Sequence, residues 1–205
     1  MNRLLEYIAG TFTAPRSTFA QIAKEGSMGA AVNIFILTAL ISSAAGLSGL
    51  PAREIQIEPL RLFPLAIVAT FIFGALGWLL QTGIYHLFAE FLGGHGRALA
   101  LFLILPFTTL PGIILTPINL VLSSLGVPLI GIFTSLALLA WIIFLQLIAL
   151  SAVYNISQLR AAAVVFLPPV ILITAFIIFG LTLLTTLMPL IMETIPIYLP
   201  DILPK

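Results

Sequence analysis

Apolar residues fill most of this chain in long runs, and the charged residues fall in short clusters between them. The runs without Asp, Glu, Lys or Arg are residues 26–52, 62–89, 98–159 and 161–192. A helix needs about 20 apolar residues to cross the hydrocarbon core of a bilayer. Three runs therefore predict one span each, while the run 98–159 is long enough for two spans. The turn between these two falls at residues 123–128, where serine, glycine and proline gather.

The pattern predicts an all-α membrane protein with a transmembrane bundle of five helices. The predicted spans are residues 28–50, 63–90, 99–122, 128–153 and 163–188. A transmembrane β-barrel would instead need short segments in which apolar and polar residues alternate. Runs such as 130–150 are apolar on every face, which favours helices over strands. The predicted domains are an N-terminal segment 1–25, a transmembrane domain 26–190 and a proline-rich tail 191–205.

Composition supports the membrane interpretation and narrows the chemistry. Apolar residues make up 61% of the chain and charged residues 7%, whereas soluble domains have roughly 45–50% and 25%. Too little polar surface is available to cover a water-soluble globule. The absence of cysteine excludes disulfides and thiolate metal sites. The net charge of +1 gives no reason to expect a nucleic-acid partner.

Lysine and arginine in the short loops predict the orientation of the bundle. With five spans, one side holds the N-terminus and carries Arg3, Arg16, Lys24, Arg97 and Arg160. The opposite side carries Arg53, Arg61 and Lys205, together with Glu54, Glu58, Glu193 and Asp201. Because positively charged loops remain in the cytoplasm, we expect the N-terminus inside and the C-terminus outside.

The two ends of the chain are expected to lie at the membrane surfaces. In segment 1–25, one helical face carries Leu4, Leu5, Ile8 and Phe12. Pro15 suits the first turn of a second short helix. We therefore expect two amphipathic helices at the cytoplasmic interface, with an unstructured polar leader as the alternative. The tail 191–205 contains three prolines and is expected to lie along the outer surface.

Prolines interrupt the third predicted span. They are Pro106, Pro111 and Pro117. Each interior proline removes a backbone hydrogen bond, and in lipid the freed carbonyl needs another partner. We expect this helix to be bent or broken inside the bundle, with hydroxyl donors supplied by Thr108 and Thr109. A candidate site for a transported solute or a lipid comprises Pro111, Thr116 and Asn119. The favoured alternative is a kinked helix that serves packing alone.

A second candidate site lies at the predicted cytoplasmic end of span 63–90. His86 and Glu90 are four residues apart and share a helical face, and Arg97 follows in the loop. Such a pair could bind a metal or relay protons. No third ligand of suitable geometry is evident, so the favoured interpretation is a polar cap in which Glu90 pairs with Arg97 or His86. We expect no metal and no cofactor.

The sequence contains no motif typical of catalysis. It has no glycine-rich phosphate loop, no nucleophile elbow and no zinc-protease motif. We therefore expect no enzymatic activity.

Three features of the sequence carry a family resemblance. They are Ala14-Pro15-Arg16-Ser17-Thr18-Phe19, Phe91-Leu92-Gly93-Gly94-His95-Gly96-Arg97, and Pro106 in the next span. Together they resemble the Yip family (Ypt/Rab-interacting proteins), and particularly its short prokaryotic members. The likeness runs from Leu4 to Leu187. The residues that match are Pro15, Arg16, Phe19, Gly93, Gly94 and Pro106. We interpret them as structural, with the glycine pair permitting a tight turn.

The resemblance implies an architecture and a class of function. Eukaryotic Yip proteins have five spans and act in vesicle traffic by binding prenylated Rab GTPases through a long cytosolic N-terminal region. Only about 25 residues precede the first span here, so Rab binding is not expected to carry over. We expect a non-enzymatic scaffold or partner-binding subunit for membrane organisation or trafficking, in the cytoplasmic (inner) membrane of a prokaryote. Its partners would be membrane lipids and either another protein or a second copy of the chain. The alternative is a small-solute transporter or a lipid-handling protein.

Overall fold

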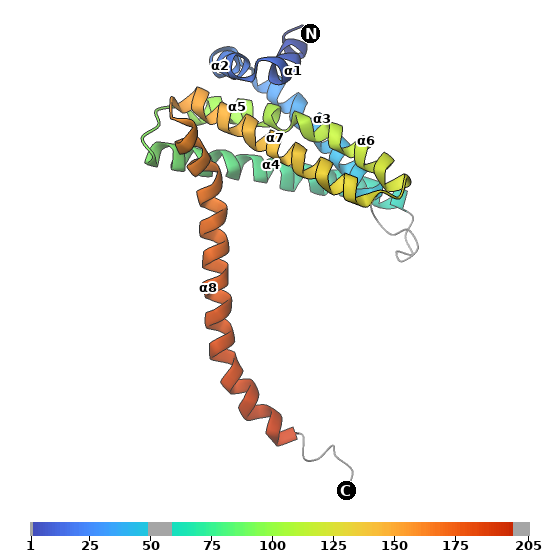
Figure 1. The fold of residues 1–205 in the computed structure, drawn as a ribbon, viewed down its shortest axis with the longest axis vertical. Helices are drawn as coiled ribbons and strands as arrows, with labels where there is room; N and C mark the ends of the chain where they lie inside the picture. Colours follow the sequence, from blue (N-terminus) through green and yellow to red (C-terminus); the bar gives the residue numbers. More distant parts are fainter. Residues whose placement is uncertain (1, 49–58, 199–205) are drawn as a thin grey trace. The chain divides into compact units, whose positions relative to one another are not determined.

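The computed structural model describes residues 2–48 and 59–198, and every regular element within these ranges is a helix (Figure 1). The helices are α1 (Asn2–Thr13), α2 (Pro15–Glu25), α3 (Met28–Ser48), α4 (Pro59–Phe91), α5 (Ala98–Thr108), α6 (Leu110–Ser124), α7 (Pro128–Tyr154) and α8 (Gln158–Tyr198). The chain divides into two units, Met1–Val165 and Phe166–Lys205.

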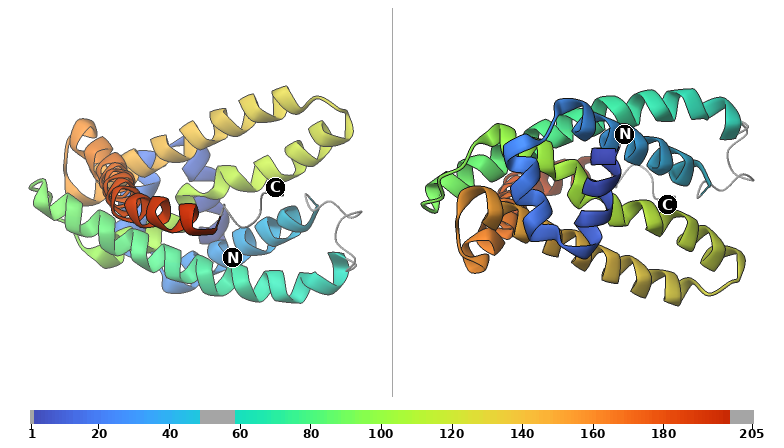
Figure 2. Two further views of the ribbon diagram at one scale, coloured as in Figure 1. Left: turned by 90° about the horizontal axis from the view of Figure 1, so that it is seen from below. Right: turned by 90° about the horizontal axis from the view of Figure 1, so that it is seen from above.

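Helix α5 forms the centre of the first unit. Apolar residues lie on all its sides, a pattern expected of a helix surrounded by others. Its residues from Ala100 to Thr108 are buried except for Phe102, which is half-buried. Helices α1, α2, α3, α4, α6 and α7 all contact it. Around it α3 packs along α4 and α6 packs along α7 (Figure 2).

Helices α1 and α2 pack on α5 and α7. Tyr7 of α1 meets Phe107 edge to face, with ring centroids 6.0 Å apart. Phe12 meets Trp141 in the same way at 5.7 Å. Phe107 and Trp141 lie near the middle of the segments 98–124 and 128–154. Helix α1 therefore contacts these two segments near their middle. That α1 lies at the cytoplasmic interface of the membrane remains a prediction.

The third predicted span is two helices rather than one. Helix α5 ends at Thr108 and α6 begins at Leu110, where residues 99–122 were predicted as one bent or broken segment. At the junction, the backbone N–H of Thr109 donates to the carbonyl of Pro106 over 3.2 Å. The expected break is therefore present and falls between the first two prolines of the segment.

Two helices extend beyond the predicted spans. Helix α4 begins at Pro59, before the predicted span 63–90, and α8 runs from Gln158 to Tyr198, beyond both ends of the predicted span 163–188. Pro189 and Pro196 lie within α8, so the part of the tail up to Tyr198 is helical. Each proline removes a single backbone donor, which a helix in lipid tolerates. Residues 199–205 of the predicted tail lie outside the described residues.

Several helices are suited to a membrane. By length and composition, Pro64–Phe91, Leu129–Tyr154 and Gln158–Pro189 could each cross one. Shorter apolar helical stretches cover Met28–Ala44 and Ala98–Ile114. The described chain is therefore an all-helical protein with membrane-spanning character.

The second unit consists of α8 from Phe166 onward, and its described side chains beyond Pro168 are exposed. The pair Pro168-Pro169 removes the N–H groups that would bond the carbonyls of Val164 and Val165. Val164 and Val165 are buried in the core of the first unit. The boundary between the units thus coincides with the point where α8 loses two consecutive backbone hydrogen bonds.

Candidate functional site

The carbonyl group that Pro106 leaves without a backbone donor is bonded by a neighbouring helix. In an unbroken α-helix the N–H of residue 106 would donate to the carbonyl of Phe102, and proline has no N–H. The indole Nε1–H of Trp78 in α4 donates to this carbonyl at 3.0 Å. The rings of Trp78 and Phe102 also stack, with centroids 3.9 Å apart and planes inclined by 10°. Helix α4 thus supplies the donor that the proline removed.

Threonine hydroxyls donate to two further carbonyls at the break. Thr108 Oγ1 donates to the carbonyl of Leu105 at 2.7 Å. Thr109 Oγ1 donates to the carbonyl of Pro106 at 2.8 Å. The sequence predicted these threonines as donors to carbonyls freed by the prolines, but the carbonyl freed by Pro106 accepts from Trp78 instead. The break is therefore hydrogen-bonded by protein groups, as a helix interruption at membrane depth requires.

The candidate residues after the break are placed differently from this cluster. Pro111 is buried and is the second residue of α6, where its missing N–H costs no helical hydrogen bond. The side chains of Thr116 and Asn119 lie outside the described part of the structure. The third-span site proposed from the sequence therefore has one described member, Pro111.

A cavity of about 500 Å³ lies beside the break, between α3, α4 and α5. Its lining residues are Phe35, Thr38, Ala39, Ser42, Thr70, Gly74, Gly77, Trp78, Gln81, Leu105, Pro106 and Thr109. The volume falls in the range of about 300–1,000 Å³ that is typical of ligand pockets. The cavity lies on the α5 side of the break, and Pro111 does not line it.

The lining of this cavity is suited to an apolar ligand. None of the lining residues is charged. The hydroxyl of Thr38 donates to the carbonyl of Ile34 at 2.8 Å. Its proton is therefore not free to bond a ligand in the cavity. Two glycines create space: a Cβ at Gly74 would lie 3.2 Å from the ring of Phe35, and a Cβ at Gly77 would meet nothing within 4 Å. The polar residues of the lining are uncharged, and they are Thr38, Ser42, Thr70, Gln81 and Thr109.

The polar pair predicted at the end of α4 is joined by a third residue. His86 Nε2 lies 3.5 Å from Glu90 Oε1. His86 Nδ1 lies 2.8 Å from the hydroxyl of Tyr154 at the end of α7. Arg97 makes no ion pair with Glu90 among the residues that the structure describes. This arrangement agrees with the interpretation of the pair as a polar cap, in which Glu90 pairs with His86. Sequence reasoning missed Tyr154, since nothing in the spacing of the chain brings α7 to this histidine.

No metal-binding cluster accompanies this pair in the described ranges 2–48 and 59–198. No group of three or more His, Cys, Asp or Glu residues in these ranges could hold a metal ion.

A second polar link joins the same two helices, from the residue next to His86 on α4 to a residue about two turns before Tyr154 on α7. The hydroxyl of Tyr85 donates to Gln146 Oε1 at 3.1 Å, and both side chains are buried. Polar side chains of this kind fix how membrane helices pack against each other. Together with the His86–Tyr154 contact, this bond sets the register between α4 and α7.

The glycine pair after α4 serves two different purposes. Gly93 has φ +82°, a left-handed conformation that ends the helix at low cost only for glycine. The N–H of Gly94 donates to the carbonyl of Ala89 at 2.8 Å. A Cβ at Gly94 would lie 2.8 Å from that same carbonyl oxygen and 2.9 Å from Tyr154 Cβ. Gly94 is therefore required for close packing, whereas Gly93 is required for its backbone conformation.

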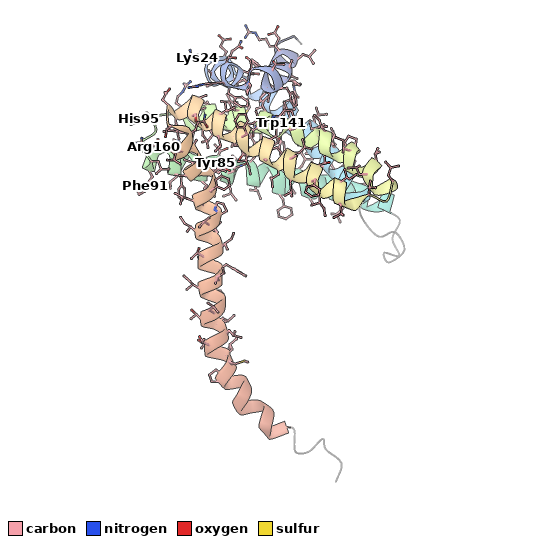
Figure 3. The ribbon with its side chains drawn as sticks, in the orientation of Figure 1. Lys24, Tyr85, Phe91, His95, Trp141 and Arg160 are labelled. Carbon is pink, nitrogen blue, oxygen red and sulfur yellow. The ribbon has the colours of Figure 1, made fainter. Side chains whose placement is uncertain are left out.

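The loop that contains these glycines is tied to the end of α7. The backbone N–H of His95 donates to the carbonyl of Tyr154 at 3.1 Å. The connections after α4 and after α7 therefore meet at one end of the bundle. In Figure 3, His95 and Arg160 mark this end, and Lys24 of α2 lies close by.

The three matching residues of α2 also have structural positions. Pro15 is the first residue of α2, where its missing N–H removes no hydrogen bond of the helix. Phe19 is fully buried and belongs to the hydrophobic core. Arg16 is exposed on the helix surface. The proline and the phenylalanine thus start the helix and anchor it on the bundle.

In a comparison with protein families, the profile of the Yip1 domain matches residues 9–181. This range contains all six residues that carried the resemblance in the sequence. No curated protein and no solved structure matches the chain.

Proposed function

Because the chain belongs to the Yip family of membrane proteins, we propose that it is a non-enzymatic scaffold that binds lipid in the α3–α4–α5 cavity. It spans a prokaryotic cytoplasmic membrane five times, through α3, α4, α5 with α6, α7 and α8. Through its exposed apolar faces it binds a partner protein or a second copy of itself, and so organises the surrounding membrane.

The contact between two loops supports the proposed orientation. The hydrogen bond from His95 to Tyr154 brings together the connections after α4 and after α7. Two crossings separate these connections in the five-span topology, so they should lie on one side of the membrane. Lys24 lines a cavity with His95 and Arg97, so the end of α2 lies near these loops, which supports an N-terminal segment on the same side. A side rich in lysine and arginine is expected in the cytoplasm, which gives an inside N-terminus and an outside C-terminus.

The cavity is the observation that carries the lipid-binding role. Its volume of about 500 Å³ and uncharged lining favour a hydrocarbon chain over a charged or strongly polar solute. Proton- or ion-coupled transporters place ionisable side chains at the substrate site, and none lines this space. Lipid chains surround any membrane protein, so the ligand is available at high local concentration.

Lipid retention tests this role with two variants of one helix. Gly77 lines the cavity and Gly83 does not, although both lie in α4 and a Cβ at either position meets nothing within 4 Å. Gly77→Leu should fill the cavity and lower the lipid that co-purifies with the full-length protein, as measured by mass spectrometry after delipidating washes. Gly83→Leu should retain as much lipid as the parent. Equal retention by all three proteins would contradict the proposal.

The scaffold role has its own test. Mild extraction from native membranes should recover a second protein, or a second copy of the chain, in fixed stoichiometry. Recovery of a lone monomer at low detergent concentration would count against it.

A further inference from the structure

A second cavity lies at the end of the bundle where the two loops meet. It has a volume of about 280 Å³ and lies between α2, the α4–α5 loop, the start of α5 and the end of α7. Lys24 comes from α2, whereas His95 and Arg97 come from the loop (Figure 3 labels the first two). Residues distant in sequence therefore bring two permanent cations and a histidine to one small space.

The charges in this cavity are not neutralised by neighbouring side chains. Among the described residues, neither Lys24 nor Arg97 forms an ion pair, and no Asp or Glu lines the cavity. Glu90, which is close along the chain, is paired with His86 instead. Both cations line the same cavity without a counterion from the described protein residues, so an anion bound between them would be attracted by both.

The start of a helix lies at the same place. Helix α5 begins at Ala98, directly after Arg97, and its first turn contains no acidic residue. The N–H of Ala100, which lines the cavity, donates to the carbonyl of Arg97 at 3.0 Å and is not a free donor. The helix start therefore adds only the positive end of its dipole, which favours an anion nearby.

We propose that this cavity binds a phosphate group, which Lys24 and Arg97 hold by charge-assisted hydrogen bonds. The expected source is the headgroup of an anionic phospholipid, because the cavity lies at the end of the bundle that we place at the cytoplasmic membrane surface. Arginine suits such a group because its fork of donors binds two phosphate oxygens at once. The site shares no residue with the α3–α4–α5 cavity, so either proposal can fail without the other.

Binding to the full-length protein in detergent tests this proposal, with three probes. Phosphatidylglycerol carries the phosphate, diacylglycerol has the same chains without it, and inorganic phosphate carries the group alone. We expect phosphatidylglycerol to bind and diacylglycerol to bind at least roughly tenfold more weakly. Displacement of phosphatidylglycerol by inorganic phosphate would show that the site takes the free ion as well, and no displacement would show that it takes the lipid headgroup; both support a phosphate site.

Charge-matched variants separate this site from general surface attraction. Lys24→Gln and Arg97→Gln should each weaken phosphatidylglycerol binding roughly tenfold, since each removes a charged hydrogen-bond partner. Arg16→Gln removes the same charge from an exposed position of α2 outside the cavity and should leave the affinity within about twofold. All three side chains are exposed, so the thermal unfolding of the variants should remain that of the parent. Unchanged affinity in both cavity variants, an equal loss in Arg16→Gln, or equal binding of diacylglycerol would overturn the proposal.

Discussion

The hydrogen bond from Trp78 to the carbonyl of Phe102 offers the sharpest test of how the broken third span is stabilised. Trp78→Phe removes the indole N–H and keeps an aromatic ring that can stack on Phe102. The carbonyl then loses the indole donor that replaces the N–H that Pro106 lacks. The free energy of unfolding should therefore fall.

The expected size of the effect follows from the geometry. The bond is 3.0 Å long and joins two helices, at half-buried side chains. An unsatisfied buried acceptor costs about 1–3 kcal/mol, whereas bonds between membrane helices average about 0.6 and reach about 1.7 kcal/mol. We expect Trp78→Phe to destabilise the protein by about 1–2 kcal/mol. The assay is reversible unfolding in mixed micelles, followed by tryptophan fluorescence or circular dichroism.

A control and a double-mutant cycle isolate the hydrogen bond from the loss of ring area. Trp141 is half-exposed, meets Phe12 edge to face and makes no hydrogen bond within the described residues, so Trp141→Phe should cost only about 0.5 kcal/mol. Pro106→Ala restores a backbone N–H that can donate to Phe102. In that background Trp78→Phe should cost about 1 kcal/mol less than in the parent. The reasoning fails if Trp78→Phe costs no more than Trp141→Phe, or if Pro106→Ala leaves its cost unchanged.

Two further predictions concern the end of the bundle where α4 meets α7. Gly94→Ala should destabilise the protein by about 1–3 kcal/mol in the same unfolding assay, because the added Cβ would lie 2.8 Å from a backbone oxygen. As a control, Gly83→Ala should be neutral or stabilising, because a Cβ there meets nothing within 4 Å. The opposite ranking of the two variants would contradict the packing role of Gly94. Tyr85→Phe should cost about 1–3 kcal/mol because it leaves the buried Gln146 Oε1 without a donor. Tyr154→Phe should cost less, about 0.5–1.5 kcal/mol, because its partner His86 is half-buried and water can replace the bond. Equal losses of unfolding free energy in Tyr85→Phe and Tyr154→Phe would contradict this dependence on the burial of the partner.

The positions of the apolar helices could be predicted from the sequence because each depends on a local property. A long run without charge is helical in any arrangement, and the loops follow from where the charges fall. The break near Pro106 was also predictable, since proline removes a donor whatever surrounds it. Helices α4 and α8 extend beyond the predicted spans because a proline in an otherwise apolar helix does not fix where that helix begins or stops.

The contacts between helices could not be predicted in the same way. A span such as 130–150 is apolar on all sides, so its pattern does not tell which face meets a neighbour and which meets lipid. The pairing of Trp78 with Phe102 and of His86 with Tyr154 depends on helices that are far apart in sequence. The α3–α4–α5 cavity depends on small residues of two helices meeting at the break. The candidate site predicted in the third span contained Pro111, whereas the cavity lies beside Pro106.

The number of membrane crossings is the central claim, and cysteine labelling tests it most directly. The chain has no cysteine, so single cysteines at exposed Ser17, at exposed Leu125 in the α6–α7 turn, and at Lys205 each give one label position. With a membrane-impermeant maleimide on intact spheroplasts, we predict labelling at positions 125 and 205, and labelling at 17 only after permeabilisation. Labelling of positions 17 and 205 from the same face would contradict an odd number of crossings.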